Sequence, residues 1–240
     1  MIKEKTIEVL KSANKIVFYT GAGISAESGI PTFRGVDGIW NKLKPEELAN
    51  FNAFLKNPKM VSEWYNHRRD IVHRAQPNNA HLTITKFQDK YDVKVITQNV
   101  DNLHKRAGNK IVYELHGNIE RNYCIKCKTN FNDDIPSVND IPTCTKCGGL
   151  IRPDVVWFGE MLPEDQFEAA QKAVENCDVF FIIGTTGIVY PAASLIYEAK
   201  KNGAYLIEIN IEETEVSYIA DDNYYGKAGD TMVEIYNSIL

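Results

Sequence analysis

The sequence predicts an α/β fold in which a parallel sheet is covered by helices on both faces and carries two insertions. Short, nearly all-apolar runs alternate with segments of helical periodicity, as expected for strands that are buried on both faces of a sheet. Two long segments interrupt this alternation. The chain has 240 residues, 44% hydrophobic and 25% charged, which is globular composition and enough length for one large domain with a smaller lobe.

The predicted elements follow in chain order. The first strand, IVFYT at 16–20, breaks at once into the glycine turn GAGIS. The further strand-like runs are VKVIT, IVYEL, VFFII and AYLIEI, at residues 93–97, 111–115, 179–183 and 204–209. Helical patterns lie between several of them, at residues 79–90, 164–176 and 192–202.

The two interruptions predict the smaller lobe. One looks mainly helical, and the other is polar and rich in cysteine, with little apolar periodicity. We expect a Rossmann-like domain of residues 1–34, 76–121 and 151–240, a helical module of residues 35–75, and a zinc-binding module of residues 122–150.

Charge and composition exclude several functions. A net charge of -5 gives no general basic field, which disfavours a protein that binds nucleic acid through its phosphates. No run of about 18 apolar residues occurs, and the N-terminus lacks a signal core, so we expect neither a membrane span nor export. The protein is expected to be cytoplasmic, where paired cysteines favour metal over disulfides.

The cysteine pattern predicts a metal site. Cys124-x2-Cys127 is followed, after 16 residues, by Cys144-x2-Cys147, and two such pairs complete a closed tetrahedral zinc site with a structural role. The alternative is a redox pair or disulfides. Cys177, alone before a strand, is interpreted as a small buried residue.

The glycine turn lies in the segment TGAGISAESGIPTFRG, residues 20–35. It fits the G-x-G-x-x-G/A pattern, in which glycines let a backbone approach a pyrophosphate. A purely structural turn is the alternative. The acidic residue expected about 20 positions later is missing, so this is not an ordinary dehydrogenase fingerprint. Arg34 is a cation placed where it could clamp a phosphate.

Polar groups follow the other strands. Gln98, Asn99 and Asp101, in TQNVDNLH, suit a carboxamide or ribose hydroxyls, although such a run can be a simple capping loop. His116, in LHGN, could act as a general base or be a satisfied structural histidine. The segments GTTGIVYPAA (184–193) and EINIEE (208–213) could contact a nucleotide or be plain loops.

The motifs follow one another in the order GAGISAESGIPTFRG, TQNVDNLH, LHG, CxxC…CxxC, VVWFGE, GTT and EIN. This order resembles the sirtuin family, the NAD-dependent protein-lysine deacylases. The match covers nearly the whole chain. The resemblance implies an inverted Rossmann-type domain, a small lobe made of a zinc module and a helical module, and a cleft between them for NAD and an acyl-lysine peptide.

The resemblance also implies roles for individual residues. His116 would be the catalytic base, with Asn99 as the second catalytic residue, and a mobile loop would lie around 35–38. The cofactor-binding set would be Gly21, Ala22, Gly23, Ser25, Ala26, Glu27, Ile30, Pro31, Thr32, Phe33, Arg34, Trp40, Gln98, Asn99, Val100, Asp101, His116, Gly184, Thr185, Thr186, Asn210, Ile211, Glu212 and Ala228. The peptide backbone would pair, as an added strand, with Val156, Trp157, Phe158, Gly159 and Glu160.

One position departs from the family pattern. Thr186 stands where the family usually has Ser. The hydroxyl is kept, so we expect NAD binding to persist.

The implied mechanism consumes NAD as a co-substrate. The acyl oxygen of the modified lysine attacks the ribose carbon that carries nicotinamide and forms an alkylimidate. His116 then activates the 2′-hydroxyl through ribose hydroxyls, and water releases lysine and O-acyl-ADP-ribose. An imidazole suits this role because its ordinary pKa lies near neutral pH.

The stretch EWYNHRRD, residues 63–70, suggests the acyl preference. Tyr65 and Arg68 are three apart on a predicted helix and can reach one ligand, where a guanidinium and a hydroxyl would bind a carboxylate. A solvated helix face with an aromatic anchor is the alternative. The Tyr-x-x-Arg pair resembles the sirtuin class that removes succinyl, malonyl and glutaryl groups. Trp64 is expected to pack, and Arg69 to face solvent.

The expected partners are acylated lysine side chains of proteins or peptides, with neither nucleic acid nor membrane. Three rivals remain: an enzyme that is mainly a deacetylase, a protein ADP-ribosyltransferase that uses the same pocket, and a zinc-ribbon binding module. The last is disfavoured because the cysteine region carries only scattered lysines, Lys126, Lys128 and Lys146.

Overall fold

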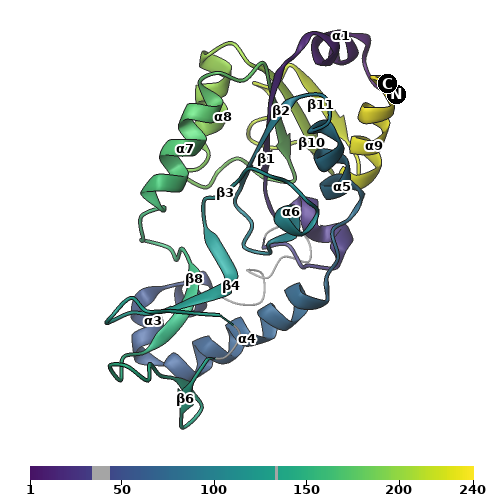
Figure 1. Ribbon diagram of the computed structural model, residues 1–240. Coiled ribbons are helices and arrows are strands. Elements are labelled where there is room, and N and C mark those ends of the chain that lie inside the picture. Colours follow the sequence, from purple (N-terminus) through teal and green to yellow (C-terminus); the bar gives the residue numbers. More distant parts are fainter. Residues whose placement is uncertain (34–43, 133–134) are drawn as a thin grey trace.

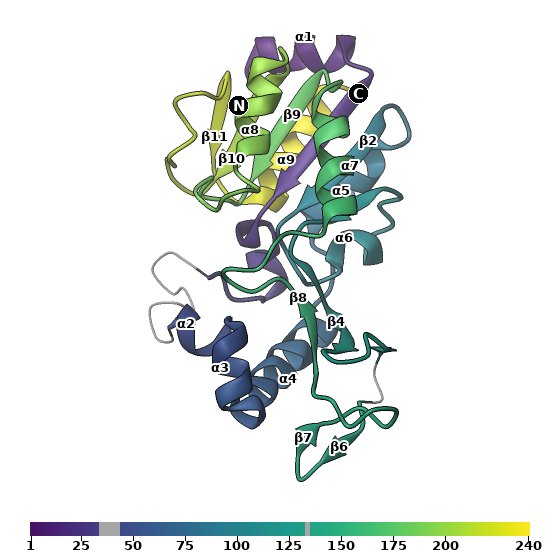
Figure 2. The ribbon, with the colours of Figure 1, turned by 90° about the vertical axis from the view of Figure 1, so that its left-hand side faces the viewer.

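The computed structural model describes residues 1–33, 44–132 and 135–240. Two lobes are visible in Figures 1 and 2: a sheet with covering helices, and a smaller lobe of helices and short strands. Arg34, Trp40 and the loop at 35–38 lie outside the described residues. Among the described residues, none of the helices is both long enough and apolar enough to cross a membrane.

The large lobe is built on a six-stranded sheet with the order β11-β10-β9-β1-β2-β3, and every neighbouring pair is parallel. The strands are β1 (Lys15–Thr20), β2 (Asp92–Thr97), β3 (Val112–Glu114), β9 (Val179–Ile183), β10 (Tyr205–Asn210) and β11 (Asp222–Tyr225). The predicted parallel sheet is therefore confirmed. The edge strand β11 was not predicted, because its sequence, DNYY, is short and polar.

Helices cover both faces of this sheet, as predicted (Figure 1). One face packs on α5 (Asn79–Phe87) and α9 (Ala228–Ser238), through Phe87 and Met232 among others. The other packs on α7 (Glu164–Val174) and α8 (Ser194–Lys201). The apolar strand residues alternate between these two cores, so the strands are buried on both sides. Near the chain ends, α1 (Glu4–Ser12) adds to the first face.

The strand order reverses beside β1. From β1 the chain proceeds to β2 and β3 on one side, and later returns to β9, β10 and β11 on the other. In open parallel sheets such a switch point leaves a crevice at the carboxyl ends of the two central strands, where ligands bind. The glycine turn after β1 and the GTT turn after β9 both lie there.

The smaller lobe packs three helices on a three-stranded sheet of order β5-β4-β8. The helices are α2 (Pro45–Leu48), α3 (Phe51–Lys56) and α4 (Pro58–Arg74), and the strands are β4 (Gly117–Cys124), β5 (Asn130–Phe131) and β8 (Ile151–Val155). A hairpin of β6 (Ser137–Val138) and β7 (Ile141–Pro142) lies beyond them (Figure 2). Their shared core includes Phe54, Val61, Tyr65, Ile119 and Trp157.

The expectation that Arg69 faces solvent is wrong. Its side chain is 9% exposed and donates to the backbone oxygen of Ile119 (2.9 Å), to Asn122 (2.8 Å) and to Asn66 (2.6 Å). Helical periodicity could not reveal this, because the face of α4 that carries Arg69 meets β4 instead of water.

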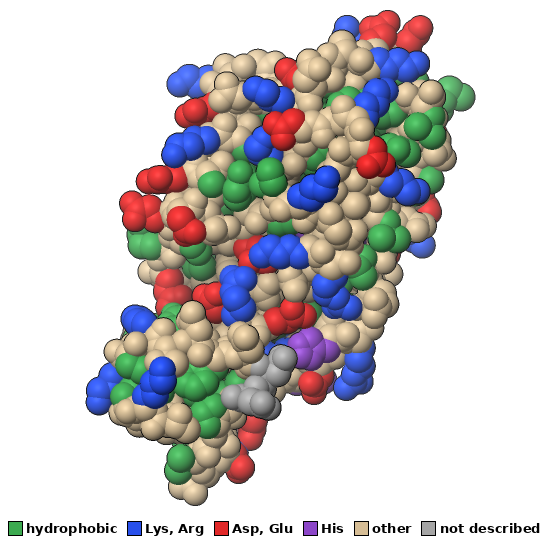
Figure 3. Space-filling model, in the orientation of Figure 1, with side chains coloured by type: hydrophobic (Ala, Val, Ile, Leu, Met, Phe, Trp, Pro, Cys, Tyr) green, Lys and Arg blue, Asp and Glu red, His purple; other side chains and the backbone are tan. Residues whose placement is uncertain are grey.

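Charged side chains of both signs are mixed on the face that Figure 3 shows. In the view of Figure 3, basic and acidic groups alternate over both lobes without a large single-sign patch. This agrees with the absence of a general basic field expected from the net charge of -5.

Candidate active site and zinc centre

The two turns at the switch point touch each other. The backbone N–H groups of Gly21 and Gly23 donate to the oxygens of Ile183 (2.9 Å) and Gly184 (2.8 Å). A Cβ on Gly23 would lie 2.6 Å from the Gly184 Cα, and Gly184 itself has a φ of +60°. These glycines therefore allow the close approach of two turns. The turn continues as a 3₁₀ helix, η1 (Ala22–Ser28).

A buried polar network links this turn to the end of β2. The Asn99 amide donates to the Gly21 oxygen (3.0 Å) and to the Ser25 hydroxyl (3.2 Å). Ser25 donates in turn to the Asp101 carboxylate (2.6 Å), which also accepts from the backbone of Leu103 (3.0 Å). Burial raises the pKa of Asp101, and these two hydrogen bonds oppose the shift. Gln98, Asn99 and Asp101 thus lie beside the glycine turn.

His116 follows β3 and precedes Gly117, whose φ is +79°. Its Nδ1 lies 2.9 Å from the backbone oxygen of Gln98. Because a carbonyl only accepts, Nδ1 carries the ring proton and Nε2 is the free acceptor. Burial lowers the pKa of His116 from 6.5, and the bond to Gln98 opposes this shift. A neutral imidazole with Nε2 available has the form that a general base needs.

A second group of predicted cofactor residues follows β9 and β10 at the same edge of the sheet. The Gln98 amide donates to the Thr185 hydroxyl (2.9 Å), and the Asn210 amide donates to the Thr185 oxygen (2.9 Å). The Glu27 carboxylate accepts from the backbone of Gly229 (2.7 Å), in the first turn of α9. Ile211 is exposed and Ala228 is buried. The structure therefore brings the segments after β1, β2, β9 and β10 to one edge.

Arg68 is a buried cation that forms no ion pair with any of the residues at 1–33, 44–132 and 135–240. Its side chain is 7% exposed, and its guanidinium lies over the rings of Phe33 (4.6 Å) and Trp64 (5.2 Å). It makes no hydrogen bond or ion pair with any residue that the structure describes. Burial lowers the pKa of Arg68, and the charges of Tyr65 and Asp101 oppose this shift; a guanidinium nevertheless stays protonated in proteins.

Tyr65 lies one helical turn before Arg68, as predicted, and is 4% exposed. Its hydroxyl oxygen accepts a hydrogen bond from the Trp157 indole N–H (2.7 Å). Burial raises the pKa of Tyr65 to about 12, against the effects of Trp157 and Arg68. The phenol therefore stays protonated at neutral pH. Trp64 packs edge-on against Tyr65, with ring centroids 4.7 Å apart.

The stretch VWFGE is only partly outward-facing. The backbone N–H of Val156 donates to the backbone oxygen of His116, and that of Phe158 donates to the backbone oxygen of Ala49 (both 3.0 Å). The Trp157 side chain is 1% exposed, whereas Phe158 is 46% exposed. The Glu160 carboxylate turns inward, and accepts from the Trp157 N–H (2.8 Å).

Arg152, on β8, is a residue that the sequence analysis missed. Its side chain is 2% exposed, its guanidinium stacks 3.4 Å from the Trp157 ring centroid, and it forms a two-point ion pair with Glu160. An arginine within the mostly apolar run LIRPDVVWF, which also contains Asp154, was the available signal, because a charge in a buried strand needs a partner.

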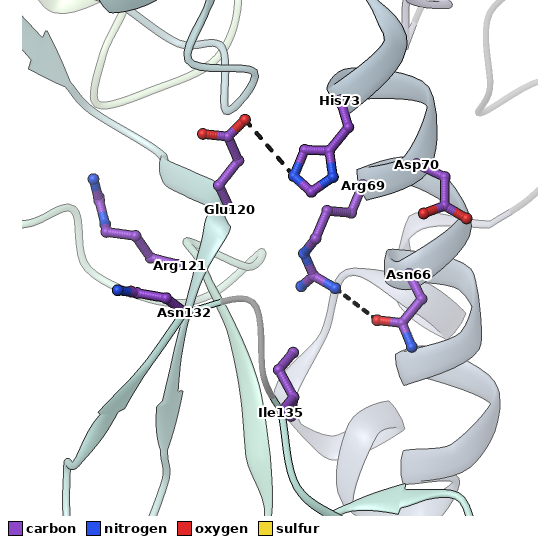
Figure 4. A pocket seen from close by; sticks show the side chains of 8 residues that line it. All are labelled: Asn66, Arg69, Asp70, His73, Glu120, Arg121, Asn132 and Ile135. Carbon is purple, nitrogen blue, oxygen red and sulfur yellow. Dashed lines mark hydrogen bonds and ion pairs between the residues drawn. The ribbon is translucent and has the colours of Figure 1, made fainter.

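A polar cavity of about 960 Å³ lies between α4 and β4, outside the switch-point crevice (Figure 4). Two contacts join its lining residues: Arg69 donates to Asn66 (2.6 Å), and His73 faces Glu120 (3.8 Å). The lining residues are Asn66, Arg69, Asp70, His73, Glu120, Arg121, Asn132 and Ile135. None of them was predicted to be functional.

The four predicted metal ligands lie together. The Sγ atoms of Cys124, Cys127, Cys144 and Cys147 all lie within 4.8 Å of one another, with pairs at 3.5 and 3.7 Å. A tetrahedron with Zn–S bonds of about 2.3 Å has edges of about 3.8 Å, so the donor set fits a structural zinc. Cys177 stands apart and donates to the Val174 oxygen (3.4 Å).

Comparisons with known proteins agree with this architecture. The model of the Sir2 family matches residues 21–191. An NAD-dependent protein deacylase of Aquifex aeolicus is 51% identical over 226 residues, covering 92% of this chain and 94% of the relative. NAD-dependent protein deacylase 1 of Archaeoglobus fulgidus is 47% identical, covering 98% and 97%.

Solved structures give the same result. A complex of a Sir2 homologue with NAD has a TM-score of 0.92 at 45% identity, covering 100% of this chain and 94% of that one. A Sir2 complex with a p53 peptide and NAD+ has a TM-score of 0.89 at 33% identity, covering 99% and 98%. The fold is thus that of Sir2 proteins, and the chain belongs to the Sir2 family.

Zinc occupancy can be tested by exchanging cysteines. We expect Cys144→Ala to abolish stoichiometric zinc, because three thiolates no longer close the tetrahedron. Structural zinc binding contributes about 10–16 kcal/mol in small zinc domains. At about 2–4 °C per kcal/mol for a chain of this size, the loss of even a third of that should lower the melting temperature by about 10 °C or more. Metal analysis and calorimetry measure both.

Cys177→Ala is the matched control and should keep its zinc. Full zinc content in Cys144→Ala, or an unchanged melting temperature after zinc loss, would show that the cluster is not a structural centre.

Proposed function

We propose that the protein is an NAD-dependent protein-lysine deacylase that removes succinyl, malonyl and glutaryl groups, and also acetyl, from lysine. Membership of the Sir2 family supports the reaction class, as do relatives named NAD-dependent protein deacylases. Similar solved structures hold NAD, ADP-ribose or a p53 peptide. The expected substrates are acylated lysine side chains of proteins or peptides.

NAD would bind at the switch-point crevice. The turn at Gly21–Phe33 would hold its phosphates, while Gln98, Asn99 and Asp101 would contact the nicotinamide and its ribose. The segments at 184–186 and 210–212, with Ala228, would hold the adenosine end. Clustering of these segments at the carboxyl edge of the sheet supports this assignment. The division into one Rossmann-like domain and two small-lobe modules, with the sequence boundaries, is part of the same proposal.

The chain would act mainly by positioning and by one base. The acyl oxygen displaces nicotinamide from the ribose carbon, and the 2′-hydroxyl then attacks the resulting imidate. His116 Nε2 would accept the proton that this attack releases, while Nδ1 stays bonded to the Gln98 oxygen. Addition of water then releases the products, free lysine and O-acyl-ADP-ribose. Val156–Glu160 would pair with the peptide backbone.

The acidic-acyl preference rests on one observation: the buried guanidinium of Arg68 has no anionic partner among the described residues. A buried charge is costly unless it is paired. An acyl carboxylate would supply the missing anion and accept a two-point, charge-assisted bond. Tyr65 presents a further hydroxyl one turn away.

Arg68→Met tests this preference. Charge-assisted hydrogen bonds contribute about 1.5–3 kcal/mol, so kcat/KM for a succinyl-lysine peptide should fall about 10- to 100-fold. For an acetyl-lysine peptide, kcat/KM should change by no more than about threefold, because acetyl has no carboxylate to lose. Nicotinamide release from NAD measures both.

Arg74→Met, at the exposed end of the same helix, is the control, and it should leave kcat/KM for both peptides unchanged. Equal losses on both peptides in Arg68→Met would refute the acidic-acyl assignment. Nicotinamide release that needs no acyl peptide would instead indicate ADP-ribosyl transfer.

The pH profile tests the base. The active form of His116 is neutral, so kcat/KM falls as the pH drops through the pKa of the free enzyme. Burial lowers that pKa, so activity should stay flat from neutral pH down to about 6.5 and decline only below it. His116→Asn should lose most activity, together with this acid limb.

His67→Asn, on the exposed side of α4, should leave the profile unchanged. A midpoint above the ordinary histidine pKa, or an unaltered acid limb in the residual activity of His116→Asn, would exclude His116 as the base.

A further inference from the structure

Trp157, which follows β8, reaches the face of α4 that carries Tyr65 and Arg68, the candidate acyl clamp. Its indole N–H donates to the Tyr65 hydroxyl oxygen at 2.7 Å, across 92 residues of sequence. Both side chains are nearly inaccessible, at 1% and 4% exposure. This is a buried polar contact inside an apolar cluster that includes Phe54, Val61 and Ile119.

The chemistry of the two groups sets the direction of the bond. An indole N–H can only donate, so the Tyr65 oxygen must be the acceptor. The phenol proton therefore points elsewhere, and it meets no acceptor among the residues that the structure describes. Leaving a buried donor unpaired is unfavourable. Beside it, Arg68 is likewise a donor without a polar partner in the described chain.

The indole bond also makes the Tyr65 oxygen less available as an acceptor for the Arg68 guanidinium. With its oxygen already occupied by Trp157, the phenol is a poor acceptor for the neighbouring guanidinium. The hydroxyl and the guanidinium both remain available for a ligand that only accepts. An ionised carboxylate has only acceptors.

Trp157 is itself held rigidly. The guanidinium of Arg152 stacks on its ring, with 3.4 Å to the centroid, and Arg152 pairs with Glu160. Glu160 also accepts the backbone N–H of Trp157 at 2.8 Å. The indole is thus fixed by its ring face, its backbone and its N–H.

We propose that Trp157 is a positioning residue for acyl specificity, which holds the Tyr65 hydroxyl as a donor toward an acyl carboxylate and keeps Arg68 free to bind the same group. This inference rests on the proposed acidic-acyl activity. Trp157 acts through Tyr65 and does not need to touch the carboxylate.

The test compares four enzymes: the unmodified protein, Trp157→Phe, Tyr65→Phe and the double variant. The loss of one buried hydrogen bond predicts a KM for succinyl-lysine peptide about three- to tenfold higher in Trp157→Phe, with kcat nearly unchanged. The KM for acetyl-lysine peptide should rise less than the KM for succinyl-lysine peptide, because any change in peptide binding by the segment 156–160 affects both peptides alike. In the Tyr65→Phe background, Trp157→Phe should have no further selective effect, because the partner is gone.

A shape-matched variant separates the N–H from ring packing. Benzothienylalanine at position 157 keeps the bicyclic ring but has sulfur in place of the N–H, so it should reproduce the selective change of Trp157→Phe without a cavity. It also keeps the test decisive if Trp157→Phe does not fold.

The outcomes separate this inference from the proposed function. If Arg68→Met loses succinyl activity selectively while the benzothienylalanine enzyme treats both peptides like the unmodified protein, the role of Trp157 is overturned and the acidic-acyl proposal stands. Additive effects of Trp157→Phe and Tyr65→Phe also overturn that role. If Arg68→Met shows no selectivity, the proposed acyl preference has failed, and the inference fails with it.

Discussion

The close contact between the turns that follow β1 and β9 is the constraint on which the candidate site depends. A Cβ on Gly23 or Gly184 would lie only 2.6 Å or less from backbone of the opposite turn. Because the two turns touch, the oxygen of Gly21 comes within reach of Asn99, and Gln98 reaches Thr185. Gln98 in turn holds His116 through its backbone oxygen. One steric condition thus assembles polar groups that follow four strands, β1, β2, β3 and β9.

The smaller lobe buries several polar side chains within its apolar core. Arg152 and Glu160 satisfy each other and hold Trp157. The chain of contacts then continues through the Trp157 indole to Tyr65 and ends at Arg68, which forms no hydrogen bond or ion pair with a described residue. A structural role explains a satisfied arginine such as Arg152 or Arg69, but it does not explain an unsatisfied one. This contrast on neighbouring elements supports a ligand role for Arg68.

Much of the large lobe could be predicted from sequence, because strands that are buried on both faces leave an unambiguous apolar signal. The strand predicted at VFFII has the same first and last residues as β9. The four predicted metal ligands also form one cluster. The edge strand β11 and helix α9 were not predicted, because neither contains a nearly all-apolar run. Arg69 was assigned to the wrong environment, because helical spacing does not reveal which face meets a second sheet.

The polar contacts of the smaller lobe could not be predicted either. Trp157 and Tyr65 are 92 residues apart, and no local pattern links them. The motif VWFGE indicated a peptide-binding strand, but it did not indicate that its Trp and Glu side chains turn inward, to Tyr65 and Arg152.

The most direct test of the account is a crystal structure of the protein with NAD and a succinyl-lysine peptide. The account predicts that the succinyl carboxylate lies within about 3 Å of both the Arg68 guanidinium and the Tyr65 hydroxyl, with the Trp157 bond to Tyr65 intact. A carboxylate that points to solvent or pairs with another cation, with Arg68 still unpaired, would contradict it.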